Sequence, residues 1–413
     1  MSDVSHEEES LKLHEQHQGK IEVRSKVPLV NKLDLSVAYT PGVAEPCRRI
    51  AADGELAYRY TIKGNMVAIV TDGSAVLGLG NIGPLAALPV MEGKALLFKA
   101  FAELDAFPIC LATQDVDEIV ETVARVAPVF GAINLEDISA PRCFEIERRL
   151  RAELDIPVFH DDQHGTAIVQ MGALLNACQV VDKKLADLRI VISGAGAAGI
   201  AIAKLLLGTE LESPVFPPVG EIILVDRKGP LYEGRPDLEM NAEKLQMARI
   251  TNLRGIRGAL ADCIVGADVF IGVSVPNLVS AEMVRTMAER PMIFALSNPV
   301  PEIGYDDALA AGAMVAATGR SDFPNQINNV LAFPGVLRGA IDARTRTITE
   351  EMKIAAAAAI ADCVGEPTPD RIVPDPFDRR VSGAVADAVR KTTTIRTSSA
   401  RPSYRRYSAL SPE

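Results

Sequence analysis

Residues 188–199 read LRIVISGAGAAG, an apolar run followed at once by three glycines in the spacing GxGxxG. The apolar run predicts a buried strand over 188–192, and the segment from Ile200 to Leu207 has a helical pattern. A strand, a glycine turn and a helix in this order are typical of a site that binds the pyrophosphate of a dinucleotide. A purely structural glycine turn is the alternative.

The three glycines have separate tasks in such a site. Gly194 permits the tight turn, Gly196 lets the backbone approach the pyrophosphate, and Gly199 lets the helix pack closely on the strand. The N-terminus of the helix then faces the anion. The candidate cofactor-binding residues of this turn are Gly194, Gly196, Ala197, Ala198 and Gly199.

The next apolar run, residues 221–225, ends at Asp226, whose carboxylate could bind the ribose hydroxyls. Asp226 lies 27 residues after Gly199, because a proline-rich insert, SPVFPPVG, lengthens the connection. Arg227 and Lys228 follow the aspartate, and their cations could pair with a 2′-phosphate instead. The sequence therefore predicts NAD or NADP as the cofactor and leaves the choice open.

Further strand-like runs alternate with helical segments, at 66–70, 108–112, 268–273 and 291–296. This alternation predicts an α/β fold with parallel sheets flanked by helices. The last run leads to Asn298, at the sheet edge where open α/β sheets bind ligands. We therefore expect Asn298 beside the nicotinamide, and an asparagine that forms a turn before Pro299 is the alternative.

Length, charge and cysteine usage restrict the class of protein. The 413 residues suffice for two or three domains. The net charge of −11 opposes binding to phosphate backbones and anionic lipids, so we expect neither a nucleic-acid nor a membrane partner. Six cysteines are scattered singly, which argues against a zinc site or a disulfide framework. The first residues do not resemble a signal peptide and no apolar stretch is long enough to cross a bilayer, so we expect a cytoplasmic enzyme.

Two pairs of adjacent carboxylates, Glu136-Asp137 and Asp161-Asp162, each follow an apolar run. Strand ends would bring the pairs together, and carboxylates without a basic neighbour repel one another unless a cation is present. Oxygen ligands suit Mg²⁺ or Mn²⁺ rather than Zn²⁺. His160 and His164 could supply imidazole ligands instead, and either acid pair alone is more often an exposed loop or a helix cap.

Two other segments are unusual for simple packing. Tyr39 stands beside a Pro-Gly turn in SVAYTPGVA, and Lys94 lies at the head of an apolar helix in PVMEGKALL. An apolar pocket would lower the pKa of Lys94 and let it act as a base, while Tyr39 could supply a proton. Either residue could also be structural.

In combination, the motifs resemble those of the malic enzymes, specifically the short bacterial type. Seven of them occur in the order of that family over roughly residues 20–390: AYTPGVA, TDGSAVLGLGNIGPLAALPVMEGKA, NLEDI, HDDQHGTA, SGAGAAGIA, LSNP and NNVLAFPG. The resemblance implies an N-terminal malic-type substrate domain and a Rossmann-like dinucleotide-binding domain with a parallel sheet. The style of the motifs changes near Gly165, so we expect domains over 1–164 and 165–390, and a disordered Ser-, Thr- and Arg-rich tail over 391–413.

The resemblance also implies roles for single residues. It implies a general acid, a general base and a residue that supports the base: Tyr39, Lys94 and Asp161. It implies three metal ligands: Glu136, Asp137 and Asp162. It implies side chains that hold the substrate carboxylates: Asn298, Asn329 and the adjacent candidate Asn328.

The implied reaction is the oxidative decarboxylation of (S)-malate to pyruvate and CO₂ by NAD(P)⁺ and Mg²⁺ or Mn²⁺, in a homodimer or higher homo-oligomer. Decarboxylation of oxaloacetate would accompany it. The alternatives are a malolactic-type enzyme, which reduces the pyruvate further to lactate, and a non-catalytic nucleotide-sensing protein. One departure is that long eukaryotic members carry a malate-binding arginine shortly after TDG, where this chain has Ser74-Ala75. The carboxylate clamp must therefore be built otherwise.

Overall fold

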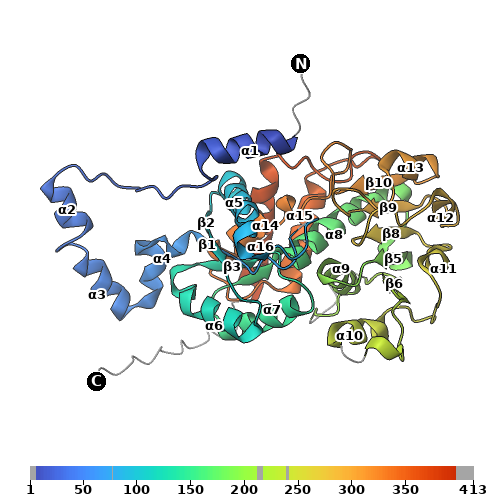
Figure 1. The fold of residues 1–413 in the computed structure, drawn as a ribbon, viewed down its shortest axis with the longest axis horizontal. Helices are drawn as coiled ribbons and strands as arrows, with labels where there is room; N and C mark the ends of the chain where they lie inside the picture. The colour runs from blue at the N-terminus through green and yellow to red at the C-terminus, as the bar shows by residue number, and fades with distance from the viewer. Residues whose placement is uncertain (1–5, 77, 212–216, 239–240, 397–413) are drawn as a thin grey trace, which may run out of the picture.

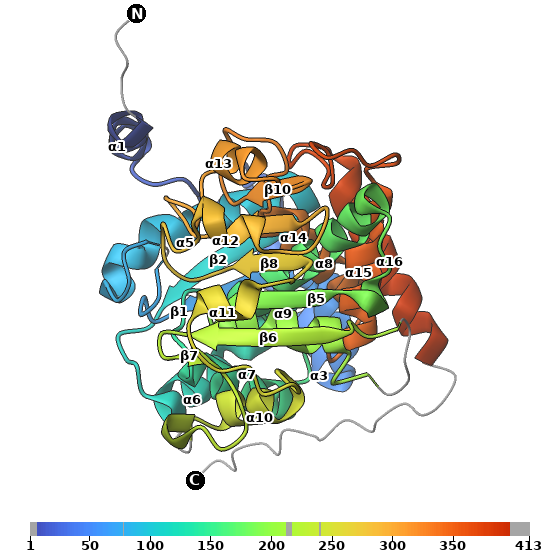
Figure 2. The ribbon, with the colours of Figure 1, turned by 90° about the vertical axis from the view of Figure 1, so that its right-hand side faces the viewer.

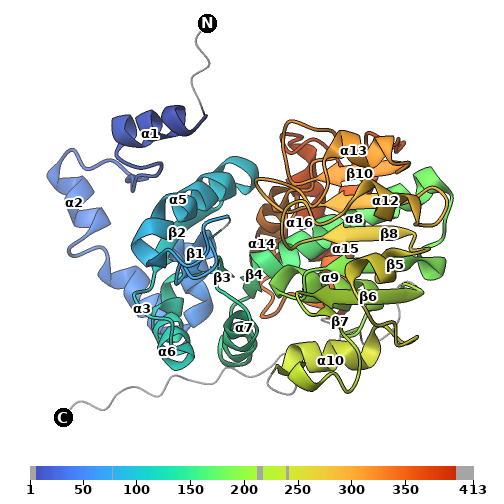
Figure 3. The same ribbon diagram turned by 45° about the vertical axis from the view of Figure 1, so that its right-hand side comes forward.

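A computed structural model describes residues 6–76, 78–211, 217–238 and 241–396 as an α/β protein with two sheets. Figure 3 shows the two sheets in separate halves of the molecule, each flanked by helices. The α/β fold expected from the alternating runs is confirmed. No helix of the described ranges is long and apolar enough to cross a membrane.

The first sheet has four parallel strands in the order β2-β1-β3-β4. They are β1 (Met66–Thr71), β2 (Asp105–Cys110), β3 (Ala132–Leu135) and β4 (Val158–His160). The helices around the sheet are α5 (Gly83–Ala102), α6 (Val116–Val126), α7 (Arg142–Glu153) and α8 (Asp161–Val181). Because side chains alternate along a strand, Val67 and Ile69 join the core of α5 and α8, whereas Ala68 and Val70 join that of α6 and α7.

The second sheet has six strands in the order β10-β9-β8-β5-β6-β7, of which only β7 is antiparallel. They are β5 (Arg189–Ser193), β6 (Glu221–Asp226), β7 (Gly229–Pro230), β8 (Val269–Gly272), β9 (Met292–Ala295) and β10 (Val315–Thr318). The helices packed on it include α9 (Ala197–Leu207), α11 (Leu260–Ile264), α12 (Ala281–Arg285) and α13 (Tyr305–Ala310). In Figure 2, α11 and α12 lie in front of the strands and α9 lies behind them. The glycine turn thus lies between the central strand β5 and a covering helix.

The long helix α8 belongs to the hydrophobic cores of both halves. Of its 21 residues, 15 are buried, and apolar side chains from both sheets share one core cluster with it. The C-terminal helices complete this cluster: α14 (Phe333–Asp342), α15 (Glu350–Asp362) and α16 (Arg380–Arg396). The chain therefore has one continuous core along α8 and a smaller core on the outer side of each sheet.

The N-terminal helices lie outside the two sheets, and the middle ones form an arm that reaches away from them (Figure 1). They are α1 (His6–His17), α2 (Lys32–Ala38), α3 (Ala44–Ala52) and α4 (Ala57–Tyr60), and none of their residues is buried. Several apolar side chains of the arm are exposed, among them Leu33, Leu35 and Val37 of α2. An apolar surface of this kind is typical of a segment that packs on another molecule.

The observed elements differ from the predicted ones at a few places. β2 begins at Asp105, three residues before the predicted strand, because it pairs along the whole of β1. β10 was not predicted, since its sequence VAAT is rich in small residues and short. Helix α16 continues to Arg396 and so includes the start of the segment expected to be disordered. Residues 397–413 of that segment, and 213–216 of the proline-rich insert, lie outside the described residues.

Candidate active site

The acidic residues gather where the connections leave the first sheet in opposite directions. From β1 the chain continues to β2 on one side and later returns to β3 on the other side. Such a point in a parallel sheet leaves a crevice at the carboxyl ends of the strands. Glu136 and Asp137 follow β3 directly, and Asp161 and Asp162 open α8 directly after β4. The predicted meeting of the two acid pairs is thus what the topology produces.

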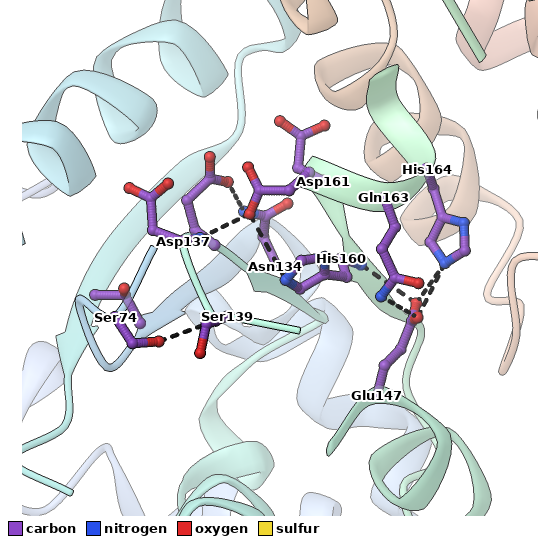
Figure 4. Close-up of polar contacts among 12 residues, drawn as sticks. Ser74, Asn134, Asp137, Ser139, Glu147, His160, Asp161, Gln163 and His164 are labelled. Carbon is purple, nitrogen blue, oxygen red and sulfur yellow. Dashed lines mark hydrogen bonds and ion pairs between the residues drawn. The ribbon is translucent and has the colours of Figure 1, made fainter. Parts of the chain in front are cut away.

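Glu136, Asp137 and Asp162 form an all-oxygen cluster. One carboxylate oxygen from each lies within 4.8 Å of the others. Asp162 Oδ2 also accepts a hydrogen bond from the backbone N–H of Asp137 at 2.8 Å (Figure 4). Asp137 has a left-handed backbone with a φ of 54°, which is unusual for a residue other than glycine. The backbone therefore holds these carboxylates together although their charges repel one another.

The electrostatics of this cluster favour a cation. Burial, and then the charges of Asp162 and Glu136, raise the pKa of Asp137 to about 9. Burial also raises the pKa of Glu136 and of Asp162. Asp137 Oδ2 is buried and has no hydrogen-bond partner among the described residues. Closely spaced carboxylates, one of which has an oxygen without a hydrogen-bond partner, fit the ligand preference of Mg²⁺ or Mn²⁺.

The two histidines do not belong to this cluster. His164 Nε2 lies 2.8 Å from Glu147 Oε1, on the side of α8 that faces α7. The His160 ring is fully buried, and burial lowers its pKa to about 4. Its Nε2 is 3.6 Å from Asp162 Oδ2, too long for a hydrogen bond. Both imidazoles therefore lie near the acidic cluster and are not among its candidate metal ligands.

Lys94 lies between the two acid pairs. Its Nζ is 2.7 Å from Asp161 Oδ2, 2.8 Å from Glu136 Oε1 and 4.2 Å from the centre of the Phe333 ring. The lowered pKa expected for a lysine in an apolar pocket is wrong: burial does oppose the charge, but Asp161 and Glu136 raise the pKa of Lys94 above its ordinary value. Burial in turn raises the pKa of Asp161 to about 8, against the attraction of Lys94. A buried lysine and a buried aspartate are thus in direct contact.

The three candidate asparagines have different surroundings. Asn329, in the short helix η6 (Asn329–Leu331) before α14, donates from Nδ2 to Asp161 Oδ2 and so joins the Lys94 group. Asn328 uses its Oδ1 to accept the N–H of Val330. Asn298 donates weakly to the carbonyl of Leu296 at 3.4 Å. Only Asn329 is tied to the carboxylates.

Tyr39 does not join the Lys94 group. It is the C-terminal cap of α2 on the arm, and it is 67% exposed. Figure 1 places α2 at the far end of the arm, away from β3 and from the start of α8. Within one chain, the predicted acid and base are therefore separated.

The loop after β1, where the malate-binding arginine is replaced, is tied to the acidic loop after β3. Ser74 Oγ accepts the N–H of Ser139 at 2.9 Å (Figure 4), and Ala75 N–H donates to the Asp137 carbonyl. At the start of the loop after β1, the fully buried Asp72 pairs with Arg142 at 2.7 Å. Ser74 thus has a structural role here.

A cavity of about 1080 Å³ lies at the corresponding point of the second sheet, between β5 and its neighbours β6 and β8. A Cβ on Gly194 would lie 2.6 Å from the Val273 carbonyl oxygen, and one on Gly199 would lie 1.8 Å from the Gly194 carbonyl oxygen. A Cβ on Gly196 would meet open space beside the cavity. Two glycines therefore serve packing, and the third leaves room for a ligand at the start of α9, which begins with Ala197 and Ala198.

Asp226 is ionised and crowded by cations at the rim of this cavity. Arg235 donates to both of its oxygens, at 3.0 and 2.6 Å, and Lys244 in α10 (Ala242–Ile250) donates at 2.6 Å. Although burial opposes this, Arg235 and Lys244 lower the pKa of Asp226 to about 2. Arg227 and Lys228 line the same cavity. The surroundings of Asp226 are more cationic than the sequence pattern suggested.

Sequence reasoning missed several residues that shape the two sites. Asn134 donates to Glu136 Oε2 at 2.8 Å from inside the β3 strand, and Phe333 lies against Lys94. Glu302 is fully buried and accepts the N–H groups of Ser274 and Ser297, which follow β8 and β9. Asn134 stands within the acidic motif, but nothing in the local pattern singled out Glu302.

Comparisons with known proteins agree with this geometry. Residues 18–151 match the family model of the malic enzyme N-terminal domain, and residues 163–394 match that of the malic enzyme NAD binding domain. The chain is 58% identical over 390 residues to the bifunctional malic/malolactic enzyme of Bacillus subtilis, covering 94% of this chain and 93% of that protein. It is 56% identical over 374 residues to the NAD-dependent malic enzyme of Geobacillus stearothermophilus, covering 90% of this chain and 76% of that protein.

Solved structures show the same architecture. The malic enzyme of Pyrococcus horikoshii superposes with a TM-score of 0.90 at 46% identity, covering 95% of this chain and 91% of that one. The NAD-dependent malic enzyme of Thermotoga maritima superposes with a TM-score of 0.88 at 50% identity, covering 92% and 98%. With both family domains present and such relatives along nearly its whole length, this chain belongs to the malic enzyme family.

Proposed function

We propose that the protein oxidises and decarboxylates (S)-malate to pyruvate and CO₂ with reduction of NAD(P)⁺, and that it requires Mg²⁺ or Mn²⁺. The observation that carries this proposal is the buried contact of Lys94 with Asp161 beside three carboxylates whose oxygens converge. A dinucleotide-sized cavity with the GxGxxG turn supplies the second half of such a site. The same residues would decarboxylate oxaloacetate.

Glu136, Asp137 and Asp162 would hold the divalent ion. Bound there, the ion would act as a Lewis acid that polarises a substrate carbonyl and stabilises the negative charge left when CO₂ departs. Glu136 also contacts Lys94, so the metal ligands and the proton-transfer pair share one side chain. Malate, itself a dianion, would be placed by the bound ion and by Asn329, with Asn298 and Asn328 as further candidates for its carboxylates.

Lys94 would take the proton of the C2 hydroxyl during hydride transfer. Its raised pKa means that the ammonium must first release a proton, and Asp161 is in direct contact to receive it. Lys94 and Asp161 would thus act together as the base.

Tyr39 would donate the proton to C3 that completes pyruvate, and we propose that it does so in the site of a second copy of the chain. It lies on an exposed arm with apolar side chains on its surface, and it is separated from Lys94 of its own chain. A homodimer or higher homo-oligomer that buries the arm would bring Tyr39 to the partner's Lys94 group.

Mixing two inactive variants tests this arrangement. Tyr39→Phe and Lys94→Ala chains, unfolded together and refolded as hybrids, should regain malate oxidation, because one site of each hybrid would contain both native residues. Refolding each variant alone is the control. Hybrids that form but stay inactive would show that Tyr39 serves its own chain, and an active Tyr39→Phe protein would show that the tyrosine has no essential role.

A malolactic reaction is the second candidate, because the Bacillus subtilis relative is named a bifunctional malic/malolactic enzyme. It would use the same residues and reduce pyruvate to lactate before NADH leaves. The decisive experiment supplies (S)-malate, Mn²⁺ and either NAD⁺ or NADP⁺, and measures CO₂, pyruvate, lactate and reduced cofactor separately. Pyruvate with equal amounts of CO₂ and reduced cofactor supports the first function, and lactate without net reduction supports the second. Dinucleotide binding without any product would leave a nucleotide-sensing protein.

A further inference from the structure

Glu147 of α7 is a buried carboxylate outside the acidic cluster, and donors from the start of α8 converge on it (Figure 4). It accepts the backbone N–H of His160 at 3.3 Å, the side chain of Gln163 at 3.1 Å and His164 Nε2 at 2.8 Å. Burial opposes its charge, but the hydrogen bond from His164 and the charge of Lys353 hold the pKa of Glu147 below its ordinary value. A permanently ionised group therefore lies behind the first turn of α8.

The hydrogen bonds that begin at Glu147 and His164 continue as a row into α15. Lys353 Nζ lies 3.0 Å from His164 Nδ1, and Lys353 also pairs with Glu350; both side chains are buried. Because an ammonium group can only donate, His164 Nδ1 must accept, and its Nε2–H must donate to Glu147. The three helices α7, α8 and α15 are thereby joined by hydrogen bonds with a single consistent direction.

The position of this row in the chain gives it a consequence for the site. Glu147 contacts His160 just before α8, and Gln163 and His164 in its first turn. Asp161 and Asp162 lie between these contacts in the sequence. The N-cap residue of α8, His160, makes no side-chain cap hydrogen bond, so the helix start depends on contacts with other elements. A shift of this turn would move Asp161 off Lys94 and Asp162 away from Glu136 and Asp137.

We infer that Glu147, oriented by His164 and Lys353, is a positioning residue that holds the first turn of α8 so that Asp162 meets the other two metal ligands and Asp161 stays on Lys94. This inference rests on the proposed metal-dependent function. The polar partners of Glu147 are His160, Gln163 and His164 and include none of the proposed metal ligands, so it acts through the helix. Side chains that orient metal ligands in this way typically change metal affinity by about 10- to 100-fold when removed.

The test measures Mn²⁺ binding to the substrate-free protein by electron paramagnetic resonance. Glu147→Gln should raise the Kd for Mn²⁺ by about 10- to 100-fold, while the Kd for NAD(P)H changes less than twofold. Glu145→Gln, on the same helix with a half-exposed carboxylate, is the matched control and should bind Mn²⁺ like the native chain.

A second pair of variants separates positioning from general stability. Lys353→Arg keeps a donor for His164 Nδ1 and should retain Mn²⁺ affinity. Lys353→Met should lose Mn²⁺ affinity as Glu147→Gln does. If Glu147→Gln does not fold, the comparison of these two Lys353 variants tests the positioning role. Native affinity in folded Glu147→Gln, or equal affinity in the two Lys353 variants, would overturn the inference. Failure of the native protein to bind Mn²⁺ would instead refute the proposed metal dependence.

Discussion

Replacing Lys94 by methionine tests whether this one cation holds the acidic cluster together. Methionine keeps most of the side-chain volume and removes the charge. Four carboxylates, Glu136, Asp137, Asp161 and Asp162, then remain in the site without an ammonium partner. We expect Lys94→Met to destabilise the metal-free protein strongly and to make its stability more dependent on a divalent ion than that of the native chain.

The magnitude follows from the two contacts of Lys94, at 2.7 Å to Asp161 and 2.8 Å to Glu136. At an effective dielectric constant of about 20, the attraction between Lys94 and each carboxylate in its ionised form is worth roughly 6 kcal/mol. The raised pKa of Asp161, about 8, reduces this attraction at neutral pH. Desolvation of the buried charged groups offsets most of this, and breaking a buried pair by removing one partner typically costs about 3–5 kcal/mol. Removal of the ammonium should also lower the Kd for Mn²⁺. Mn²⁺ at about 100 times the Kd of the variant should therefore restore about 2.7 kcal/mol by mass action, and the same concentration should stabilise the native chain less.

The assay is equilibrium urea denaturation at neutral pH, with chelator and with saturating Mn²⁺. Lys99→Met is the matched control, because Lys99 is on the same helix and also lies 2.7 Å from an aspartate, Asp105, but is 59% exposed. An exposed pair of this kind is worth about 0–1 kcal/mol. The reasoning is refuted if Lys94→Met loses no more stability than Lys99→Met, or if Mn²⁺ stabilises Lys94→Met no more than the native protein. Its malate oxidation should fall by about 10²- to 10⁴-fold.

Three other outcomes are expected. Gly196→Val should fold, since its Cβ meets open space, but should weaken NAD(P)H binding by about 10- to 100-fold in a fluorescence titration while Mn²⁺ binding is unchanged. In chelator, thermal stability should fall as the pH rises towards 9, because the pKa values of Asp137 and Asp161, about 9 and about 8, lie above those of the unfolded chain. This stabilisation is complete below the unfolded pKa of about 4 and is lost as the pH passes the folded values, and a melting temperature that rises over this range contradicts it. Lys244→Ala should weaken NADP⁺ about tenfold more than NAD⁺, and equal losses would exclude Lys244 from 2′-phosphate binding.

The fold could be predicted because most of the strands are buried along nearly their whole length and therefore read as continuous apolar runs. The runs at 66–70 and 188–192 became the central strands β1 and β5, and the glycine turn followed β5 as expected. β10 was missed because small residues in four positions give no such signal. The exposed arm was not predicted either, since local patterns specify helices but not whether they find a surface within their own chain.

The candidate site could be predicted in part, for a similar reason. Strand ends meet at one edge of a sheet, so the convergence of Glu136 with Asp162 followed from their places after β3 and β4. The charge state of Lys94 could not be predicted, because it depends on which neighbours a buried ammonium meets 42 and 67 residues further along the chain. Glu147 was missed because its partners lie on other helices and no spacing in the sequence marks it.

The burial of α8 on almost every side has a consequence for how the protein unfolds. Apolar side chains from both sheets share this helix, so neither half can melt while the other keeps its core intact. Calorimetry should therefore record one cooperative heat-absorption peak rather than two. A fragment that ends before residue 161 should expose the apolar inner face of the first sheet and aggregate. The two halves thus form a single unit of unfolding although each has a sheet of its own.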